Sequence, residues 1–472
     1  MNNNLAKLFL IISLFFGILL VFMVPSFNSP DEDSHFLYAY EISEGNLIPK
    51  VKKGVSGFYV PDEIFDYISK SKEINGDREK KYTYDEMYYD QLLPQNYEKK
   101  QFSNAVIQSS PKLAYLAPAL GIITTKFISP FGGGDVSTSV MLQFARFFSL
   151  LIYSIIGYFA IKITPKFKKT FFVVLLMPLS LFLRSMVTYD GIILVVSALA
   201  LANILKLINN EDAKFTKKDF ILFALTGFIM LNVKGVYSII FLGLFAIPSE
   251  VFRSKKDKIK TIFKIGILIL LITFLKQIPY LFLKTTNNNP YPSKQIEFIL
   301  SHPLGYIKIL LANIIGQIKI QEYWMIGTYG YLDTYMPTLF VFIMNVYLFI
   351  VFIIDAFYEK IILPLWLKIG YILLIIFDIC GMYTQMYVNW TPVVTGKVGG
   401  SEITGIQGRY FLPFLLLVPI ILNNNLLDKI FKKGKVKNYI DKLKNMFDNN
   451  FHYITITSLI IVIFIIFIRY YC

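Results

Sequence analysis

The chain has 472 residues and a formal net charge of +15, from 47 Lys and Arg against 32 Asp and Glu. It is 55% hydrophobic and 17% charged, whereas soluble domains are about one-quarter charged. These figures exclude a disordered chain and a soluble globular enzyme, and the two cysteines, Cys380 and Cys472, exclude a disulfide scaffold. A basic total fits either nucleic-acid binding or a membrane protein, so the position of the charges has to decide.

Long apolar segments predict an all-α, polytopic membrane helix bundle of about eleven spans, because a span needs roughly 20 mostly apolar residues. The first segment ends at Pro25 without a small-residue cleavage site, so we interpret it as a retained span and not as a secretory signal. The fifth and sixth segments are the least secure because they are short. The predicted spans are 8–24, 140–161, 170–188, 191–207, 219–233, 236–252, 261–283, 337–358, 361–384, 406–424 and 451–468.

Basic residues in the short loops set the orientation of a membrane protein. Here they form four clusters, which all share one side of the membrane if the N-terminus is cytoplasmic. The net charge therefore reflects orientation, and no nucleic-acid partner is expected. The clusters are Lys162, Lys166, Lys168 and Lys169; Lys206, Lys214, Lys217 and Lys218; Arg253, Lys255, Lys256, Lys258 and Lys260; and Lys429, Lys432, Lys433, Lys435, Lys437, Lys442 and Lys444.

Two further apolar segments are predicted to stay on the outer side as interfacial or re-entrant helices. If 113–129 crossed the membrane, every later basic cluster would face outward, against the rule. In 296–318, apolar residues recur at helical spacing opposite Lys308, as in a helix that lies in the interface. The two segments belong to a long first outer loop, 26–139, and to a second outer segment, 284–336.

The first outer loop opens with an acidic run beside a histidine. One interpretation is a helix start, with Ser29 as the N-cap and Glu32 as its capping-box partner. In the same helix, Asp31 and Glu32 precede His35 by four and three residues, so the three side chains are expected to converge. Such a group can take a proton from an acceptor hydroxyl or, together with Asp33, hold a divalent cation such as Mg or Mn. Both interpretations stay open.

A second carboxylate and five cations are predicted near the outer ends of spans. Asp190 either caps the fourth helix or faces the first acidic group across the outer mouth. Each cation by itself can be explained as a side chain that reaches the outer head groups. Together they predict a site for an anion such as a phosphate or diphosphate, for which arginine is geometrically suited. The five are Arg146, Arg184, Lys234, Lys276 and Arg409.

Motifs along the chain resemble the domain-of-unknown-function family 2142, a family of bacterial multi-pass membrane proteins. The resemblance covers about residues 12–425, and its last motif is the most specific. No phosphate-binding loop, dinucleotide fingerprint or Cys/His metal spacing accompanies these motifs. The matching residues are Pro30-Asp31-Glu32 with His35, Arg146, Thr188-Tyr189-Asp190, Lys234 with Tyr237, Gly330-x-Leu332-Asp333-Thr334 and Gly405-Ile406-Gln407-Gly408-Arg409-Tyr410.

That family is grouped with the GT-C type glycosyltransferases. The resemblance therefore implies a GT-C-like membrane domain over 1–425, followed by a basic cytoplasmic loop and a last transmembrane helix over 426–472. It also implies Asp31 or Glu32 as the general base or metal-binding acid. Arg146, Lys234 and Arg409 become candidates for holding a lipid phosphate. Further substrate-binding candidates on the matched motifs are His35, Asp190, Asp333, Gln407 and Tyr410.

The sequence thus predicts a glycosyltransferase of the bacterial plasma membrane that works on the outer face. It would move a sugar from a polyprenyl-phosphate-linked donor to a cell-envelope glycan, lipid or protein, surrounded by membrane lipids. One alternative is a transporter or flippase for lipid-linked glycans, which would favour charges deep in the membrane and an internal repeat. Another is a polymerase or ligase of such glycans, which would depend more on outer arginine and histidine residues.

Overall fold

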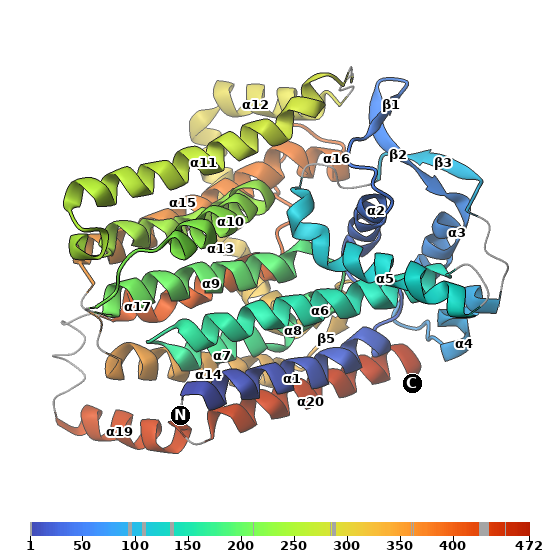
Figure 1. The fold of residues 1–472 in the computed structure, drawn as a ribbon. Coiled ribbons are helices and arrows are strands. Elements are labelled where there is room, and N and C mark those ends of the chain that lie inside the picture. Colours follow the sequence, from blue (N-terminus) through green and yellow to red (C-terminus); the bar gives the residue numbers. More distant parts are fainter. Residues whose placement is uncertain are drawn as a thin grey trace.

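Helices dominate the computed structural model of the chain, and the predicted all-α, polytopic membrane bundle is confirmed (Figure 1). Three lysines of the fourth basic cluster, Lys429, Lys432 and Lys433, lie outside the described residues. The structure describes residues 2–92, 97–105, 110–132, 136–210, 212–283, 285, 289–359, 361, 363–423, 434–448 and 450–472.

Nine helices of the described chain are long and apolar enough to cross a membrane, if α10 and the 3-10 helix after it are taken as one segment. Most run parallel or antiparallel to one another in Figure 1, around the nearly fully buried α9. The last helix packs beside the first, and Tyr471 Oη donates to the carbonyl oxygen of Met23 at 3.0 Å. The nine are α1 (Asn2–Met23), α6 (Thr138–Ile163), α9 (Tyr189–Asn209), α10 (Lys217–Lys234) with η4 (Gly235–Ala246), α11 (Lys255–Leu281), α13 (Pro303–Gly327), α14 (Thr338–Tyr358), α15 (Leu365–Asn389) and α20 (Phe451–Tyr471).

The fifth and sixth predicted spans form an antiparallel hairpin that turns at Lys234. The second arm of the hairpin consists of two 3-10 helices, η4 and η5 (Ser249–Phe252). The rings of Phe223 and Phe241 lie 6.0 Å apart, and the amide of Phe215 donates to the carbonyl oxygen of Val251 at 2.9 Å. Because a 3-10 helix rises about 2.0 Å per residue, the short η4 extends over most of the apolar thickness. The predicted turn between the two segments is present, but among the described residues 217–246 counts as one segment long and apolar enough to span, so two separate passes stay a prediction.

Two other predicted spans are broken where the sequence expectation had continuous helices. The segment 170–188 is divided into α7 (Lys168–Leu176) and α8 (Pro178–Ser185). Met177 between them has extended ψ, 137°, because the ring of Pro178 disfavours helical backbone in the residue before it. The segment 406–424 consists of the 3-10 helix η6 (Gly408–Leu417) followed by α17 (Val418–Leu422).

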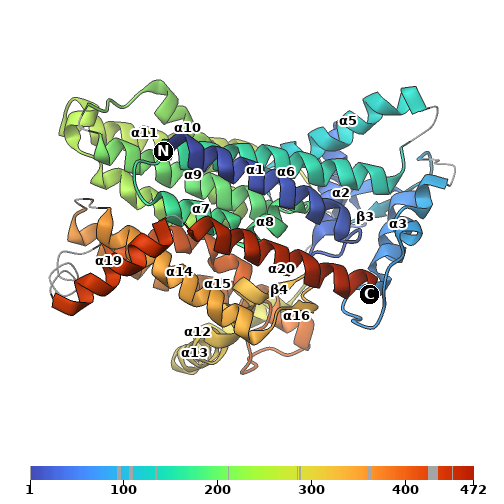
Figure 2. The same ribbon diagram turned by 90° about the horizontal axis from the view of Figure 1, so that it is seen from below.

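A small α/β cap covers the end of the bundle at which α1 ends, and we call this the capped end (Figures 1 and 2). It contains an antiparallel sheet in the order β1-β2-β3, in which Lys50 pairs with Gly57 and Phe58 with Ser103. Its elements are α2 (Glu32–Ser43), β1 (Lys50–Lys52), β2 (Val55–Pro61), α3 (Asp62–Ser71), η1 (Lys72–Ile74), α4 (Tyr84–Met87), η2 (Tyr89–Leu92), β3 (Lys100–Ser103), η3 (Lys112–Tyr115) and α5 (Leu116–Gly132).

The helix α5, at the predicted outer segment 113–129, packs against the half of α6 nearest the capped end. Tyr153, near the middle of α6, donates its hydroxyl to the carbonyl oxygen of Ala114 at 3.1 Å. Further along, Gly121 contacts the backbone of Phe144 so closely that a side chain would not fit. The chain therefore enters the bundle to about the middle of α6 and turns back out, which is the path of a re-entrant segment.

The helix α13 has the length of a span but runs across the direction of α1 and α20. Figure 2 shows it nearly end-on, whereas α1 and α20 are seen from the side. The remaining small elements are α12 (Tyr291–Ser301), β4 (Thr328–Tyr329), β5 (Thr334–Tyr335), α16 (Thr391–Thr395) and α19 (Gly434–Asp448). The polar face of α13 holds an extended segment of the chain that leads to Arg409. Three amides spaced one turn apart donate to this segment: Asn313 to the oxygen of Ser401 at 2.8 Å, Gln317 to that of Ile403 at 2.8 Å and Gln321 to that of Ile406 at 3.3 Å.

Candidate functional site

Four charged side chains from four separate segments meet at the capped end, and we call them the charged cluster. They are Asp31 before α2, Asp190 in α9, Lys234 at the end of α10 and Arg409 in η6. The guanidinium of Arg409 lies between the two carboxylates, with Nη2 3.0 Å from Asp31 Oδ2 and Nε 3.1 Å from Asp190 Oδ2. Lys234 Nζ lies 2.7 Å from Asp190 Oδ1. Acids and cations thus alternate, and Asp190 faces Asp31 across Arg409.

The local sequence explains how each member of the cluster is positioned. Thr188 is the N-cap of α9 and accepts a hydrogen bond from the amide of Asp190 at 3.2 Å. The capping role considered for Asp190 is therefore taken by Thr188, which leaves the Asp190 carboxylate free to reach the cations. Gly408 sits against the backbone of Trp324 and Met325, and only a residue without a side chain allows this approach. The close packing of η6 on α13 fixes the start of the helix that carries Arg409.

Asp31 is the member of the cluster that faces solvent. Its side chain is 58% exposed, against 5% for Arg409 and for Asp190. Its φ of 63° is left-handed, a conformation that Asp tolerates better than most residues but that still costs energy. Strained backbone of this kind occurs often at functional sites. Asp31 is the N-cap of α2, yet its side chain caps nothing, because the carboxylate binds Arg409 instead.

The predicted capping box at the start of α2 is wrong. The helix begins at Glu32, not at Pro30, and the hydroxyl of Ser29 has no hydrogen-bond partner within the described residues. The left-handed turn at Asp31 directs the Glu32 side chain into the bundle, where it meets Arg146. Glu32 therefore cannot accept the hydrogen bond from the N-cap backbone N–H that a capping box needs.

Glu32 and Arg146 form a fully buried, bidentate ion pair. Arg146 donates through Nε to Oε1 at 2.8 Å and through Nη2 to Oε2 at 2.6 Å. The backbone amide of Val187 also donates to Oε1, at 3.0 Å. The remaining N–H groups of Arg146 bind the carbonyl oxygens of Val24, at 2.6 Å, and Pro25, at 3.0 Å, where α1 has just ended. The pair therefore ties the start of the outer loop to α6 and to the segment between α8 and α9, and Glu32 has no access to solvent.

His35 lies on the inner side of the cluster and not beside the acids that precede it in the sequence. Its Nδ1 is 2.6 Å from the hydroxyl of Tyr115, and its ring meets that of Tyr189 edge-on at 4.6 Å. Burial lowers the pKa of His35 from 6.5 to about 3, so the imidazole is neutral at physiological pH. The predicted convergence of Asp31, Glu32 and His35 is therefore wrong: the turn at Asp31 sends the three side chains in different directions.

The acidic run offers no common metal site. Asp31 binds Arg409, Glu32 binds Arg146, and Asp33 pairs with Lys72 at 2.7 Å. Within the described part of the chain, no group of three or more His, Cys, Asp or Glu side chains is arranged to hold a metal ion. Because Mg and Mn need several convergent oxygen ligands, these residues do not fit either ion.

Aromatic rings surround the cations of the cluster. Lys234 Nζ lies 3.8 Å from the centre of the Tyr410 ring and 5.0 Å from that of Tyr189. The hydroxyl of Tyr237 donates to the carbonyl oxygen of Tyr410 at 2.9 Å and so links η4 to η6. Rings that face an ammonium group stabilise its charge where little water is present. Tyr410 was a predicted site residue. Tyr189 and Tyr237 were not, although each lies near a predicted charge in the chain.

An apolar groove of about 610 Å³ runs along α5, α6, α9 and α10 toward the cluster. Its walls include Leu116, Ile156 and Leu225. The lining of the groove also includes Ile192, two residues after Asp190, and Ile229, five residues before Lys234. The groove has the volume of a typical ligand site and the surface of a site for hydrocarbon. A second cavity, behind Arg409 and lined in part by Gln407, measures about 20 Å³ and has room for about one water molecule.

Three further predicted residues, like Glu32, Arg146 and His35, do not belong to the cluster. Asp333 pairs with Arg469 at the end of α20, with Nη2 2.8 Å from Oδ2. Arg184 is buried beside α1, where Nη2 donates to Ser13 Oγ at 3.1 Å. Lys276 lies near Lys112 at the edge of the bundle, close enough for the two charges to repel. Arg469 was missed, although a cation after the last span violates the orientation rule in the same way as the five that were found.

Comparison with known proteins agrees with the motifs described above. No curated protein and no solved structure matches this chain. Residues 14–418 match the sequence profile of a family described as predicted membrane protein (DUF2142). This match covers the acidic run, α6, α9, α10 and Arg409, and therefore all four segments of the charged cluster. The chain belongs to the DUF2142 family of multi-pass membrane proteins.

Proposed function

We propose that this protein is a membrane glycosyltransferase that moves a sugar from a polyprenyl-phosphate-linked donor to a cell-envelope acceptor. In this proposal the capped end is the outer face. The observation that carries it is the charged cluster: one exposed carboxylate, Asp31, is held by a buried guanidinium, Arg409. An apolar groove lies along α9 and α10, the two helices that carry Asp190 and Lys234. An acid open to the acceptor, cations for a phosphate and a path for a hydrocarbon chain are the three parts that such a transfer needs.

Asp31 is the residue to which we assign the role of general base. It takes the proton from the acceptor hydroxyl while the acceptor oxygen forms a bond to the anomeric carbon of the sugar. The bond from that carbon to the phosphate oxygen breaks, and polyprenyl phosphate leaves with the electron pair. Glu32 was an equal candidate in the sequence, but its burial against Arg146 supports a positioning role. Asp31 has the exposure that a base for an incoming hydroxyl requires.

Arg409 and Lys234 are the residues to which we assign the leaving phosphate. Arg409 Nη1 is buried and has no hydrogen-bond partner within the described residues, so one N–H group of the site is available to a phosphate oxygen. The prenyl chain would lie in the groove along α5, α6, α9 and α10, whose lining includes Ile192 and Ile229 on the helices that carry Asp190 and Lys234. Negative charge that develops on the phosphate is then met by fixed cations in a site with little water.

A complementation experiment tests the proposal, with the envelope sugar composition as the readout. Asp31→Asn keeps a residue that tolerates the left-handed backbone, so the fold should survive while the base is lost. We expect Asp31→Asn and Arg409→Gln to lose the added sugar at normal protein levels. Asp33→Asn, the matched control two residues away and paired with Lys72, should keep it. Retention of the sugar in Asp31→Asn would overturn the assignment of the base.

A flippase for lipid-linked glycans is the second candidate, and one observation favours it. Arg184 lies within the bundle beside Phe9 and Ser13, and its Nε and Nη1 have no partner among the described residues. Charges at such depth are typical of substrate paths. The two functions differ in where the donor accumulates when Arg409 is replaced. A transferase leaves the lipid-linked sugar exposed on the outer leaflet, whereas a flippase leaves it on the inner leaflet.

A further inference from the structure

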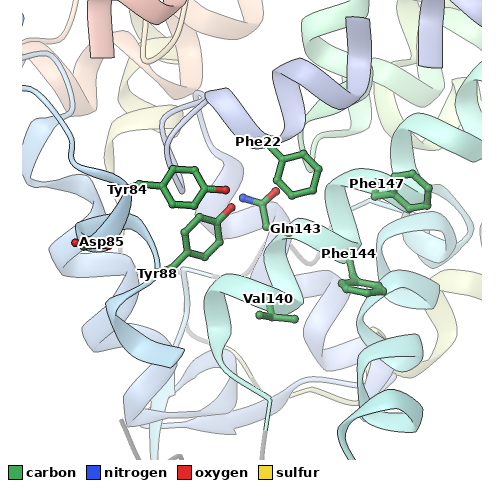
Figure 3. A pocket seen from close by; sticks show the side chains of 8 residues that line it. All are labelled: Phe22, Tyr84, Asp85, Tyr88, Val140, Gln143, Phe144 and Phe147. Carbon is green, nitrogen blue, oxygen red and sulfur yellow. The ribbon is translucent and has the colours of Figure 1, made fainter. Parts of the chain in front are cut away.

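A second large cavity lies at the capped end, on the side of α6 that faces α4 and the end of α1 (Figure 3). Its volume is about 670 Å³, within the range of small-molecule sites. One wall is aromatic, with Phe22 from α1 and Phe144 and Phe147 from α6. The opposite side carries hydroxyls, from Tyr84 and Tyr88. The cavity is therefore amphiphilic, and none of its lining residues belongs to the charged cluster.

The amide of Gln143 lies at the polar side of this cavity without a protein partner. Gln143 is 6% exposed, and neither its nitrogen nor its oxygen has a hydrogen bond within the described residues. The hydroxyl of Tyr88 is also buried and unpartnered there. Figure 3 shows the amide end of Gln143 and the two tyrosine hydroxyls directed toward one another. Because a buried amide without partners is unfavourable, the site is matched to a group that can both donate and accept, such as a hydroxyl.

The lining of the cavity includes an exposed apolar side chain at the end of α1. Phe22 is 45% exposed and lies on the same face of the helix as two other exposed apolar side chains, Phe15 and Leu19. In a span, a face of this kind is in contact with lipid. The occupant therefore enters from the membrane and brings an apolar chain with it, which the phenylalanine wall can cover.

Charge separates this occupant from the anionic donor. Asp85 is the charged side chain among the described residues that line the cavity, and no lysine or arginine is among them. A phosphate head group would meet a carboxylate here and no cation, which is unfavourable in a partly apolar site. An uncharged head group with hydroxyls meets hydrogen-bonding groups of both kinds.

We propose that this cavity binds a neutral lipid whose head group carries hydroxyls, of the diacylglycerol or neutral glycolipid class. Its chain packs on Phe22 and Phe144, and a head-group hydroxyl accepts from and donates to the Gln143 amide. Gln143 lies one turn before Arg146 in α6, so the bound head group sits next to the ion pair that fixes the outer loop. The proposal does not rest on the sugar-transfer reaction.

Photo-crosslinking in liposomes tests this site with the full chain. Two probes are compared at equal mole fraction, a photoactivatable diacylglycerol and a photoactivatable phosphatidylglycerol, and the labelled peptides are mapped by mass spectrometry. We expect the diacylglycerol probe to label α4 and the first half of α6 about tenfold more than the anionic probe. Equal labelling of these peptides by both probes would overturn the proposal.

Two variants test the contacts. Gln143→Leu keeps the shape of the side chain but removes both hydrogen-bonding groups, and should lower diacylglycerol labelling about tenfold without loss of thermal stability. Val140→Trp fills the cavity and should abolish labelling, whereas Ile155→Trp, on the lipid face of the same helix and outside the cavity, should leave it unchanged. Unchanged labelling in Gln143→Leu or in Val140→Trp would show that the lipid does not occupy this cavity.

Discussion

The substitution Glu32→Gln separates a structural from a catalytic role for the second acid. In the folded protein both Glu32 oxygens accept from donors that have no access to water: Arg146 Nε and the Val187 amide on one oxygen, and Arg146 Nη2 on the other. The glutamine NH₂ group would face donors at either position, and the Arg146 charge would be left uncompensated. Breaking a buried ion pair in this way costs about 3–5 kcal/mol.

Asp33→Asn is the matched control, because Asp33 is the next residue and also pairs with a cation. That pair is partly exposed, with Lys72 at 32% and Asp33 at 21%, so its loss should cost at most about 1 kcal/mol. The assay is equilibrium unfolding of each purified variant under matched conditions. If Glu32→Gln is no less stable than Asp33→Asn, the ion pair does not hold the loop and the reasoning is refuted.

A double variant adds an independent check on the same pair. Glu32→Met with Arg146→Met removes both charges together and replaces them with apolar groups that fill the space. It should therefore be more stable than either single variant, because neither charge is left buried alone. A double variant whose destabilisation equals the sum of the two single ones would show that the two residues do not interact.

Three further predictions concern pH and packing at the capped end. Burial raises the pKa of Glu41 from 4.5 to about 7. The stability that this acid contributes at low pH is therefore lost as the pH rises through 7. Glu41→Gln should raise the melting temperature at pH 8 but not at pH 5. The pKa of His35 is lowered to about 3, so stability falls as pH drops from 6.5 toward 3, and melting curves of His35→Phe should show a weaker decline. Gly408→Ala should displace Arg409 and abolish the proposed sugar transfer, whereas Gly381→Ala, with open space around it, should leave that transfer at the wild-type level.

The passes of the chain through the bundle could be predicted because they depend on local quantities. Apolar length and the position of lysines are read directly along the sequence, and nine helices of the described chain have the length and composition of spans. The break before Pro178 was also readable, since proline restricts the residue before it. The 3-10 geometry of η4 and η6 was not, because it arises from packing of neighbouring helices and not from composition.

The partners of the acids could not be predicted from the sequence. Asp31 and Glu32 are adjacent, yet they bind cations that are 378 and 114 residues away in the chain. Which of them turns inward depends on the left-handed backbone at Asp31, and a local rule that assumes regular helix from Pro30 onward gives the wrong direction. The cations Lys234 and Arg409 were found because they lie on the outer side, against the orientation rule. This position can be recognised from the sequence without knowledge of the fold.

The amides of Asn313, Gln317 and Gln321 give the cluster a dependence on the bilayer itself. They tie the segment before Arg409 to α13, whose other face exposes Leu304 and Ile315 by 75% and 68%. A helix with such a face rests on the hydrocarbon boundary, and that boundary fixes its depth. A detergent micelle has no flat boundary to supply this reference plane. Activity measured in micelles will therefore underestimate that in a bilayer, and it will vary among bilayers of different thickness.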